Sequence, residues 1–448
     1  MMENFLLVGN GAREHAIAEA VCRNANVRLF AFMSANHPGI SSLVKRSGGE
    51  FAIGDIHSPQ QVAAFAERLG ITLAFPSPDA VLAAGVTDAL LIAGIPCAAP
   101  TREASRLEWD KAYCRELLRD FHVPGAPKFG IFDNEREAHS FIDAMNGQVA
   151  VKPSGLTGGK GVKVTGFQLK NDAEAKQYAT ELLSAKRGGK ASIVIEEKLD
   201  GEEFSLQAFS DGSKVHGMPL VQDHKRAYEG DVGPNTGGMG SYSDANHLLP
   251  FLKRAHRDDA LSIMQKTIDA FRKKTGKPYI GVLYGGFMAT KGGVKLIEYN
   301  ARFGDPEAMN VLSILKSDLY GIFEQMAAHK MKKAPEFENK ATVCKYLVPE
   351  GYPVKSVTDQ PLKIDSAALE KTGARVFYAS VYEKDGAIYT QSSRSMGLVG
   401  IADTIEEAEK IAESACGAIT GAVWHRRDIG TPELLKRRTA HMKQIGEL

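Results

Sequence analysis

Short apolar segments alternate with amphipathic segments through the first hundred residues, and this alternation restricts the fold more than any other feature of the chain. The apolar runs have the length of buried strands, and the segments between them carry apolar residues at helical spacing. The predicted strands are Phe5–Val8, Val27–Met33 and Leu73–Phe75, and the predicted helices are Arg13–Arg23, Pro59–Leu69 and Asp79–Ala93. Such an alternation predicts a parallel sheet covered by helices, with ligands at the carboxyl ends of the strands.

The remainder of the chain lacks this regular alternation and contains longer strands. The clearest predicted strands are Ser192–Glu196, Glu203–Phe209, Val282–Thr290 and Ala341–Leu347. Near the C-terminus, Thr404 opens a capping-box pattern ahead of a helix. This part therefore has an α+β pattern.

The length of the chain gives an expected number of domains. A length of 448 residues, at about 150 residues per domain, indicates roughly three domains.

Charge and cysteine pattern exclude several classes of protein. Lys and Arg number 55 and Asp and Glu 54, and the resulting net charge of +1 argues against a nucleic-acid binder. The five cysteines are scattered and never form a CxxC pair, which disfavours a disulfide framework or a zinc site. No signal-peptide pattern is present, and no apolar run approaches the roughly 18 residues of a membrane span. We therefore expect a cytoplasmic protein with no nucleic-acid or membrane partner.

The first candidate motif is GNGAREHA, which begins at Gly9 between a predicted strand and a predicted helix. Glycines let the backbone approach a ligand, and the N–H groups at a helix start attract anions. The motif therefore indicates a phosphate site with Arg13 nearby, and a tight turn of purely structural role is an equally good interpretation. It is not a complete dinucleotide fingerprint, because Glu14 stands where a third glycine or an alanine is required.

A second motif follows the predicted strand Gln148–Val151. Lys152 is followed by a loop with four glycines and a second lysine, and strand character resumes at Val162–Val164. Such a hairpin can surround a polyphosphate with N–H groups while lysines neutralise its charge. It is not a Walker A loop, because Gly161 follows Lys160 where that pattern requires Ser or Thr. A flexible surface hairpin is the alternative, and the lysine at the strand end favours nucleotide binding.

Two further motifs combine backbone and charged groups. In the run IEEKLDGEE, which starts at Ile195, a strand leads into a linker that could present backbone groups to an adenine and a carboxylate to a ribose. Taken alone, this run is more typical of a solvated acidic turn.

The long segment that contains QDHKR and GPNTGGMG, from Gln222 to Gly240, is rich in glycine and charge. Long loops inside a domain are usually functional or disordered. We interpret this one as a substrate-contacting loop, and a mobile surface loop is the alternative.

The run EYNARFGDPE, residues 298–307, predicts a metal site. Alternate residues of a strand share a face, so Glu298 and Asn300 direct two oxygen ligands to one point while Tyr299 faces the other way. Oxygen ligands suit Mg²⁺ or Mn²⁺ held jointly with phosphates. Arg302 could stabilise charge on a transferred phosphoryl group. A half-exposed edge strand followed by a turn is the structural alternative.

The same motifs, in the same order, resemble those of the glycinamide ribonucleotide synthetases, a family of the ATP-grasp superfamily. The resemblance is carried by GNGAREHA, WDKAYCRELL, KPSGLTGGKGV, IEEKLDGEEFS, QDHKR, GPNTGGMG, EYNARFGDPE and the C-terminal RRDIG. It extends over nearly the whole chain. It implies an N-terminal Rossmann-like domain at residues 1–102, an ATP-grasp clamp of two subdomains at 103–333 and a C-terminal mixed α+β lid domain at 334–448. Within the clamp, a lid subdomain is expected at about 123–193.

The resemblance also implies a reaction. ATP phosphorylates the carboxylate of glycine, and the amine of 5-phosphoribosylamine displaces phosphate to form glycinamide ribonucleotide. ATP and Mg²⁺ or Mn²⁺ are the implied cofactors, and a monomer or weak homo-oligomer is expected. The implied catalytic residues are Arg302, Lys225 and Asp223, and the implied metal ligands are Glu298 and Asn300. The implied ATP-binding residues are Lys111, Lys152, Gly158, Gly159, Lys160, Gly161, Glu196, Glu197, Leu199 and Glu203. The implied substrate-binding residues are Gly9, Asn10, Gly11, Arg13, Pro78, Asp79, Gly238 and Asp305.

Three alternatives remain at the level of sequence. Another ATP-grasp ligase, or an ATP-grasp carboxylase acting on a purine precursor, lacks the combination of GPNTGGMG and RRDIG. A nucleotide-binding regulatory protein would not need two metal-ligating oxygens beside Arg302. An NAD-dependent oxidoreductase would account for the first sixty residues but not for the hairpin that carries Lys152.

Overall fold

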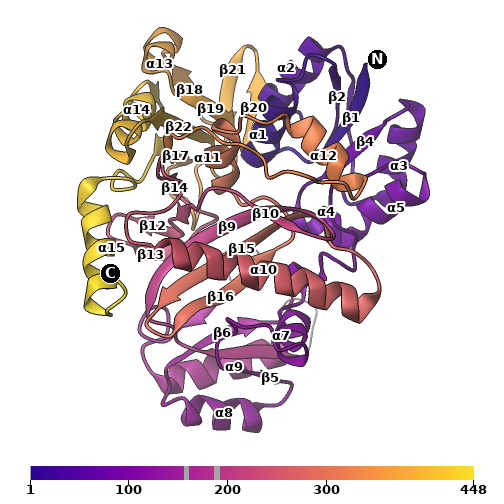
Figure 1. The fold of residues 1–448 in the computed structure, drawn as a ribbon. Helices are drawn as coiled ribbons and strands as arrows, with labels where there is room; N and C mark the ends of the chain where they lie inside the picture. Colours follow the sequence, from indigo (N-terminus) through magenta and orange to yellow (C-terminus); the bar gives the residue numbers. More distant parts are fainter. Residues whose placement is uncertain (1, 156–160, 186–191) are drawn as a thin grey trace.

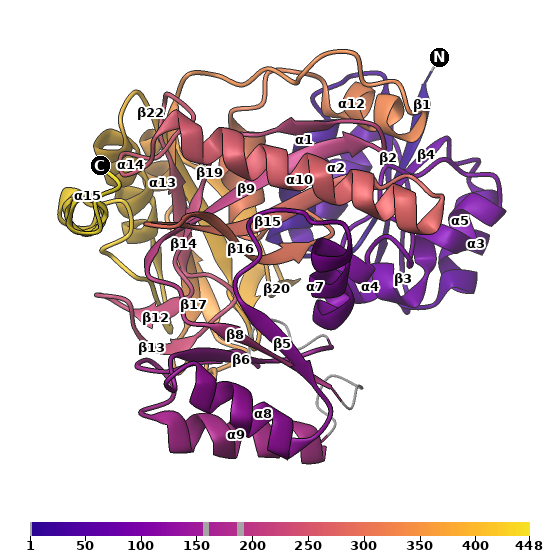
Figure 2. The same ribbon diagram turned by 60° about the horizontal axis from the view of Figure 1, so that its bottom comes forward.

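The computed structural model describes residues 2–155, 161–185 and 192–448. The described residues form several sheets, and helices pack on the larger ones (Figure 1). The sheet of residues 129–197 projects from the remainder together with its two helices, and the N- and C-terminal parts lie at the opposite end (Figures 1 and 2). Within the described part of the chain, no helix has both the length and the apolar character needed to cross a bilayer.

The N-terminal sheet is parallel, as the sequence predicts, and its strand order is β3-β2-β1-β4. Its strands are β1 (Glu3–Val8), β2 (Val27–Met33), β3 (Phe51–Ile53) and β4 (Leu73–Pro76). Its helices are α1 (Ala12–Val21), α2 (Pro38–Ser47), α3 (Pro59–Arg68), α4 (Asp79–Ala84) and α5 (Val86–Ile92). The chain is Rossmann-like here, and the carboxyl ends of β1 and β4 meet at one edge of the sheet.

Two details of this region differ from the sequence prediction. The single helix expected at Asp79–Ala93 is two helices, because Gly85 adopts a left-handed φ of 86° that no helix interior accommodates. Helix α2 and strand β3 were not predicted. The start of α2 is fixed by Pro38 in its first turn and by the ring of His37, whose Nδ1 accepts a hydrogen bond from the Ile40 N–H at 3.1 Å.

The middle of the chain forms two antiparallel sheets. The larger has the order β10-β9-β15-β16, and the smaller has the order β5-β8-β6-β7. The strands of the larger are β9 (Gly201–Asp211), β10 (Val215–Gly217), β15 (Ile280–Thr290) and β16 (Gly293–Asn300). Those of the smaller are β5 (Phe129–Phe132), β6 (Val149–Pro153), β7 (Lys163–Val164) and β8 (Ile193–Glu197). The nearby helices are α6 (Arg106–Trp109), α7 (Lys111–Asp120), α8 (Glu135–Ala144), α9 (Asp172–Ala185) and α10 (Arg254–Thr275).

Helices α8 and α9 pack on the smaller sheet and give it a hydrophobic core of its own. Helix α10 packs across the larger sheet (Figure 2). The two sheets approach each other where β6 and β8 come near β16. The strands expected at residues 192–196, 203–209 and 282–290 are therefore confirmed as β8, β9 and β15, with small differences at their ends.

The C-terminal part is mixed α+β, as expected. Its main sheet has the order β11-β14-β17-β22-β19, and β17 confirms the strand expected at 341–347. The strands of this part, within the main sheet and outside it, are β11 (Gln222–Asp223), β12 (Arg226–Tyr228), β13 (Val232–Asn235), β14 (Gly240–Ser243), β17 (Ala341–Pro349), β18 (Pro361–Ile364), β19 (Arg375–Tyr378), β20 (Val381–Lys384), β21 (Ala387–Thr390), β22 (Met396–Ala402), β23 (Ile419–Thr420) and β24 (Val423–Trp424). The helices are α11 (Glu307–Ser313), α12 (Leu319–Ala327), α13 (Ser366–Thr372), α14 (Ile405–Gly417) and α15 (Pro432–Gln444).

The cap predicted for α14 is confirmed. The Thr404 hydroxyl accepts a hydrogen bond from the Glu407 N–H at 3.2 Å. Strands β11 and β14 come from the segment 222–243 and pair into the same sheet as β17. The segment that carries QDHKR and GPNTGGMG is therefore built into the C-terminal sheet at both of its ends.

Candidate active site

Strand β16 ends with the two oxygen-bearing side chains that the sequence singled out. Tyr299 points to the opposite face, where it is buried and its hydroxyl lies 2.8 Å from that of Thr267. Glu298 and Asn300 therefore share the other face, as the alternation of a strand requires. In this structure Asn300 Oδ1 accepts a hydrogen bond from Arg302 Nη2 at 3.4 Å.

Glu298 is surrounded by cations. The Lys225 ammonium lies 3.5 Å from its carboxylate. Burial alone would raise the pKa of Glu298, but Lys225, Lys111 and Lys152 together lower it to about 2. The group is therefore an anion at neutral pH. Burial alone would lower the pKa of Lys225, but nearby carboxylates raise it above its ordinary value. Glu298 has the largest effect among them.

Lys152 and Arg115 share one buried carboxylate. Lys152 Nζ lies 2.6 Å from Glu196 Oε2, and Arg115 Nε lies 2.6 Å from Glu196 Oε1. The side chains of all three are less than a tenth exposed. The carboxylate of Glu196 thus faces two cations within the protein.

The same two cations also reach strand β16. Lys152 Nζ donates to the Ile297 carbonyl at 3.1 Å, and Arg115 Nη2 donates to the Leu296 and Ile297 carbonyls at 2.9 and 2.8 Å. The lysine-bearing strand β6 and the acidic strand β16 therefore face each other at residues next to Glu298. A small cleft opens beside this contact, and it is lined by Glu203, Phe204, Ser205, Asp223, Lys225, Tyr284, Gly286, Phe287 and Ile297.

Of the other residues expected to bind ATP, Glu203 lines this cleft, some lie elsewhere in the described part of the chain, and three lie outside the described residues. Gly158, Gly159 and Lys160 are in the latter group. The Gly161 carbonyl accepts a hydrogen bond from the Tyr178 hydroxyl at 2.8 Å. Lys111, at the start of α7, has its Nζ 3.5 Å from the Gly155 carbonyl. Glu203 is exposed at the cleft, and Glu197 and Leu199 belong to β8 and the linker that follows it.

Two buried carboxyl groups, Asp223 and Glu307, lie near each other, and Asp223 also lines the cleft. Asp223 Oδ1 and Glu307 Oε1 are buried, and neither has a hydrogen-bond partner in the structure. Burial raises the pKa of both groups, and Glu307 further raises that of Asp223. Unpaired buried oxygens are costly, so this pair is suited to a cationic or proton-bearing ligand.

Glycines enclose the carboxyl pair. Gly238 has a φ of 109°, and a Cβ on it would lie 2.6 Å from Asp223 Oδ1 and 2.6 Å from Pro306 Cδ. A Cβ on Gly304 would lie 2.5 Å from Glu307 Oε2. The two loops around the pair therefore pack too closely to accept a side chain at either glycine.

Arg302 is the cation next to the Asn300 side chain. Its Nη2 lies 3.0 Å from Glu108, and its Nε is buried without a partner. Burial raises the pKa of Glu108 to about 7, although Arg302 acts in the opposite direction. Glu108 also accepts the Ala301 N–H at 2.8 Å and thereby fixes the chain between Asn300 and Arg302.

The N-terminal loop 9–13 binds a carboxylate of the protein itself, that of Glu14. The Glu14 carboxylate accepts the Gly11 N–H at 2.7 Å and pairs with Arg13 Nε at 2.7 Å. It also accepts a hydrogen bond from the Ser77 hydroxyl. The acidic residue that breaks the dinucleotide fingerprint therefore occupies the start of helix α1 itself. The Asn10 side chain accepts the Ser34 N–H at 3.0 Å.

This loop joins the remaining predicted substrate residues to the central site. Arg13 Nη1 donates to the Phe303 carbonyl at 3.3 Å. Gly9 packs against Pro78, with a φ of 122° that requires a glycine. Burial would raise the pKa of Asp79, but Arg302 and Arg13 lower it. The carboxyl ends of β1 and β4 thus meet the loop that follows β16.

Sequence reasoning missed several residues of this site. Arg115 was visible within WDKAYCRELL and Glu307 within EYNARFGDPE, but no role was assigned to either. Glu108 and Arg394 had no local signal, because their partners Arg302 and Asp305 are distant in sequence. Glu14 lies within the first motif, but no site role was assigned to it. Asp305, which was predicted, accepts the Tyr346 hydroxyl at 2.6 Å and pairs with Arg394 at 3.2 Å.

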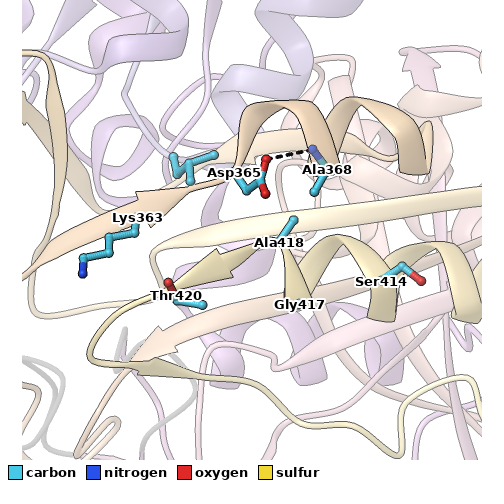
Figure 3. Close-up of a pocket in the computed structure, with 8 residues that line it drawn as sticks. Lys363, Asp365, Ala368, Ser414, Gly417, Ala418 and Thr420 are labelled. Atoms are coloured by element: carbon cyan, nitrogen blue, oxygen red, sulfur yellow. Dashed lines mark hydrogen bonds between the residues drawn. The ribbon is translucent and has the colours of Figure 1, made fainter.

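A second hollow lies in the C-terminal part, between β18, α13 and the end of α14 (Figure 3). Its polar lining is Lys363, Asp365, Ser414 and Thr420. The Asp365 carboxylate accepts the Ala368 N–H at 2.9 Å and serves as the cap of α13. No set of converging charges comparable to that near Glu298 is seen among the described residues of this hollow, and we assign it no chemistry.

Comparison with known proteins settles the family. Models of the phosphoribosylglycinamide synthetase N domain, ATP-grasp (A) domain and C domain match residues 3–108, 109–308 and 342–432. A phosphoribosylamine–glycine ligase of Methanothermobacter thermautotrophicus is 49% identical over 440 residues, covering 98% of this chain and 99% of that protein. The chain belongs to the phosphoribosylglycinamide synthetase family. A second such ligase, from Pyrococcus horikoshii, is 46% identical and covers 99% of this chain and 98% of its own.

Solved structures agree on the fold of this phosphoribosylglycinamide synthetase family member. The phosphoribosylamine–glycine ligase of Thermotoga maritima has a TM-score of 0.79 at 24% identity, over 95% of this chain and 100% of its own. The biotin carboxylase domain of 2-oxoglutarate carboxylase from Hydrogenobacter thermophilus, solved with MgADP and bicarbonate, has a TM-score of 0.73 at 17% identity. It covers 99% of this chain and 98% of its own. At these identities the likeness shows the shared ATP-grasp fold.

Proposed function

We propose that this chain joins glycine to 5-phosphoribosylamine at the expense of ATP, through a glycyl phosphate intermediate. The products are glycinamide ribonucleotide, ADP and phosphate. The observation that carries the proposal is the contact of the Lys152 strand with the strand of Glu298 and Asn300 at one cleft. The resemblance to phosphoribosylamine–glycine ligases over nearly the full chain supports the choice of substrates.

The chemistry requires an activated acyl group, because a carboxylate has no good leaving group. One carboxylate oxygen of glycine attacks the γ-phosphorus of ATP, the bond to the bridging oxygen breaks and ADP leaves. The amine nitrogen then attacks the acyl carbon, phosphate leaves with its oxygen and the nitrogen loses a proton. Phosphoryl transfer of this kind depends mainly on positioning and charge stabilisation.

The ATP phosphates have suitable cationic partners in this cleft. We assign Lys111, Lys152 and the loop 155–161 to the phosphates, Glu203 to the ribose and the linker backbone at Glu197–Leu199 to the adenine. Lys225 and Arg302 approach Glu298 and Asn300 from two sides, at 3.5 and 3.4 Å. We assign these two cations to the transferred phosphoryl group, where they stabilise developing charge.

The donor set at the end of β16 fits Mg²⁺ or Mn²⁺. Glu298 is anionic at neutral pH and Asn300 offers an amide oxygen on the same face. No group of three or more His, Cys, Asp or Glu side chains among the described residues could hold a metal alone. We therefore assign Glu298 and Asn300 as ligands that act together with phosphate oxygens. The bound cation would neutralise phosphate charge.

We assign the carboxyl pair Asp223 and Glu307 to the ammonium group of glycine. Both have a buried oxygen without a partner, and an ammonium supplies three donors. Gly238 and Asp305 complete this subsite. The pocket is small, since side chains at Gly238 and Gly304 would collide with the two carboxyl groups. A small amino acid is the substrate that fits such an enclosure.

We assign 5-phosphoribosylamine to the edge of the N-terminal sheet that meets the loop after β16. Gly9, Asn10, Gly11, Arg13, Pro78 and Asp79 lie at the carboxyl ends of β1 and β4. Arg13 contacts the loop after Asn300, so a ligand held here is close to the acyl carbon.

The five cysteines are free thiols, which fits the cytoplasmic location we expect.

The test is ADP formation with each substrate omitted in turn. Full turnover is expected only with ATP, Mg²⁺, glycine and 5-phosphoribosylamine together. Replacing glycine with bicarbonate tests the carboxylase alternative, and titrating NAD against ATP with Mg²⁺ in a calorimeter tests the oxidoreductase alternative. ADP release that depends on bicarbonate and not on glycine would overturn the proposal.

A further inference from the structure

Arg394 connects two active-site loops from the C-terminal domain. It lies between β21 and β22, outside every motif of the sequence. Its Nη1 is 2.7 Å from the Gly237 carbonyl, 3.1 Å from the Gly238 carbonyl and 3.3 Å from the Asp305 carbonyl. The same nitrogen is 3.2 Å from the Asp305 carboxylate. One guanidinium nitrogen therefore touches four oxygens on two loops.

The guanidinium is itself held firmly in place. Its carbon lies 4.4 Å from the ring centre of Tyr346, an arrangement that favours cation–π attraction. The Tyr346 hydroxyl donates to the same Asp305 carboxylate at 2.6 Å. The Arg394 side chain is only 14% exposed. A cation that is mostly removed from water and bonded to several acceptors has one preferred position.

The contacts lead directly to the carboxyl pair. Gly238 packs against both Asp223 and Pro306, so its position sets the space around the unpaired Asp223 oxygen. Asp305 and Pro306 immediately precede Glu307. Holding the carbonyls of Gly237, Gly238 and Asp305 at one point thus fixes the distance between the loop beside Asp223 and the loop that leads into α11 at Glu307.

We propose that Arg394 is a positioning residue for the amino-acid subsite, through which the C-terminal domain sets the geometry of the Asp223 and Glu307 pair. This rests on the proposed function, because it deepens the assignment of that pair to glycine. Arg394 touches neither carboxyl group of the pair in the structure. Its effect reaches the substrate through the two loops.

The experiment compares steady-state kinetics of Arg394→Gln, Arg394→Lys and Arg375→Gln with the wild type. Arg375 is a matched control, since it belongs to the same domain and pairs with Glu19 of the N-terminal domain away from both loops. We expect Arg394→Gln to raise the KM for glycine by about tenfold or more while the KM for ATP changes by less than about twofold. Arg394→Lys should recover part of this loss, and Arg375→Gln should leave the KM for glycine unchanged.

Thermal unfolding of each variant separates positioning from general damage. The proposal is overturned if Arg394→Gln leaves the KM for glycine within about twofold of the wild type, or if it raises the KM values for glycine and ATP by the same factor. The wild type serves as the test of the underlying function. If wild-type ADP formation does not depend on glycine, the proposed function fails, and if only the variant is unaffected, the role of Arg394 fails alone.

Discussion

Single side chains in this cleft act through the charges that surround them. Glu298 remains ionised because three lysines face it, and Lys152 remains fixed because Glu196 and the Ile297 carbonyl hold its ammonium. A buried ion pair contributes little net stability, but removal of one partner leaves an uncompensated charge. Arg115 still pairs with Glu196 when Lys152 is absent, so the fold should tolerate that loss better than an isolated pair would.

We predict that Lys152→Ala and Glu298→Ala each lower turnover by about a hundredfold or more, because the first removes a cation proposed to neutralise the ATP phosphates and the second removes a proposed metal ligand. The measurement is ADP release at saturating substrates, with circular dichroism to verify folding. Lys340→Ala is the control, since Lys340 forms a surface ion pair with Asp403 far from the cleft along the chain. A near-normal rate of ADP release from either cleft variant would show that the site is wrongly assigned.

At the scale of elements, loops that contain glycine enclose the proposed amino-acid subsite. The segment between β13 and β14 brings Gly238 against Asp223, and the segment between β16 and α11 brings Pro306 against the same glycine. Both segments contain glycines whose neighbours leave no room for a side chain. Backbone approach of this kind is a common reason for glycine at a functional site.

Gly238→Ala should therefore abolish most activity with glycine, because its Cβ would lie 2.6 Å from Asp223 Oδ1. Gly230→Ala is the matched control. Gly230 also has a positive φ, of 76°, but a Cβ there meets no atom within 4 Å. Both variants bear a backbone cost of about 1 to 3 kcal/mol, measured by urea unfolding. Equal loss of activity in the two variants would mean that strain, and not the collision, is responsible.

At the scale of the whole molecule, the N- and C-terminal parts are joined by a buried histidine pair. His37 Nε2 lies 3.0 Å from the Tyr378 carbonyl, and His15 Nδ1 accepts the Tyr378 N–H at 3.0 Å. Burial lowers the pKa of His15 to about 3 and that of His37 to about 4. Both rings are therefore neutral in the folded protein at pH values where an unfolded histidine is already protonated.

This gives a pH dependence with a definite sign. Between about pH 4 and 6.5 the unfolded chain binds more protons than the folded one, so stability falls as the pH is lowered. His37→Asn keeps a side chain able to cap α2 but removes the titrating ring. From pH 7.5 to pH 5 the wild type should lose about 2 kcal/mol more than this variant, measured by urea unfolding. An identical loss in both proteins would contradict the role of His37.

Much of the fold and part of the site could be read from local pattern. The parallel sheet, the strands of the clamp and the cap of α14 follow from periodicity and cap chemistry, which depend on neighbours a few residues apart. The exceptions are instructive. The break at Gly85 and the helix capped by His37 depend on a backbone conformation and a ring contact that periodicity does not contain.

The sequence alone determined that Glu298 and Asn300 share a face, because the alternation of side chains is a property of any strand. It also determined that Lys152 stands at the end of a strand, ahead of a glycine-rich loop. Tertiary structure alone decided which charges these groups meet. Glu196 pairs with a lysine 44 residues away and an arginine 81 residues away, and Arg394 reaches Gly238 across 156 residues. Such contacts arise from how whole sheets and domains pack, and no local pattern specifies them.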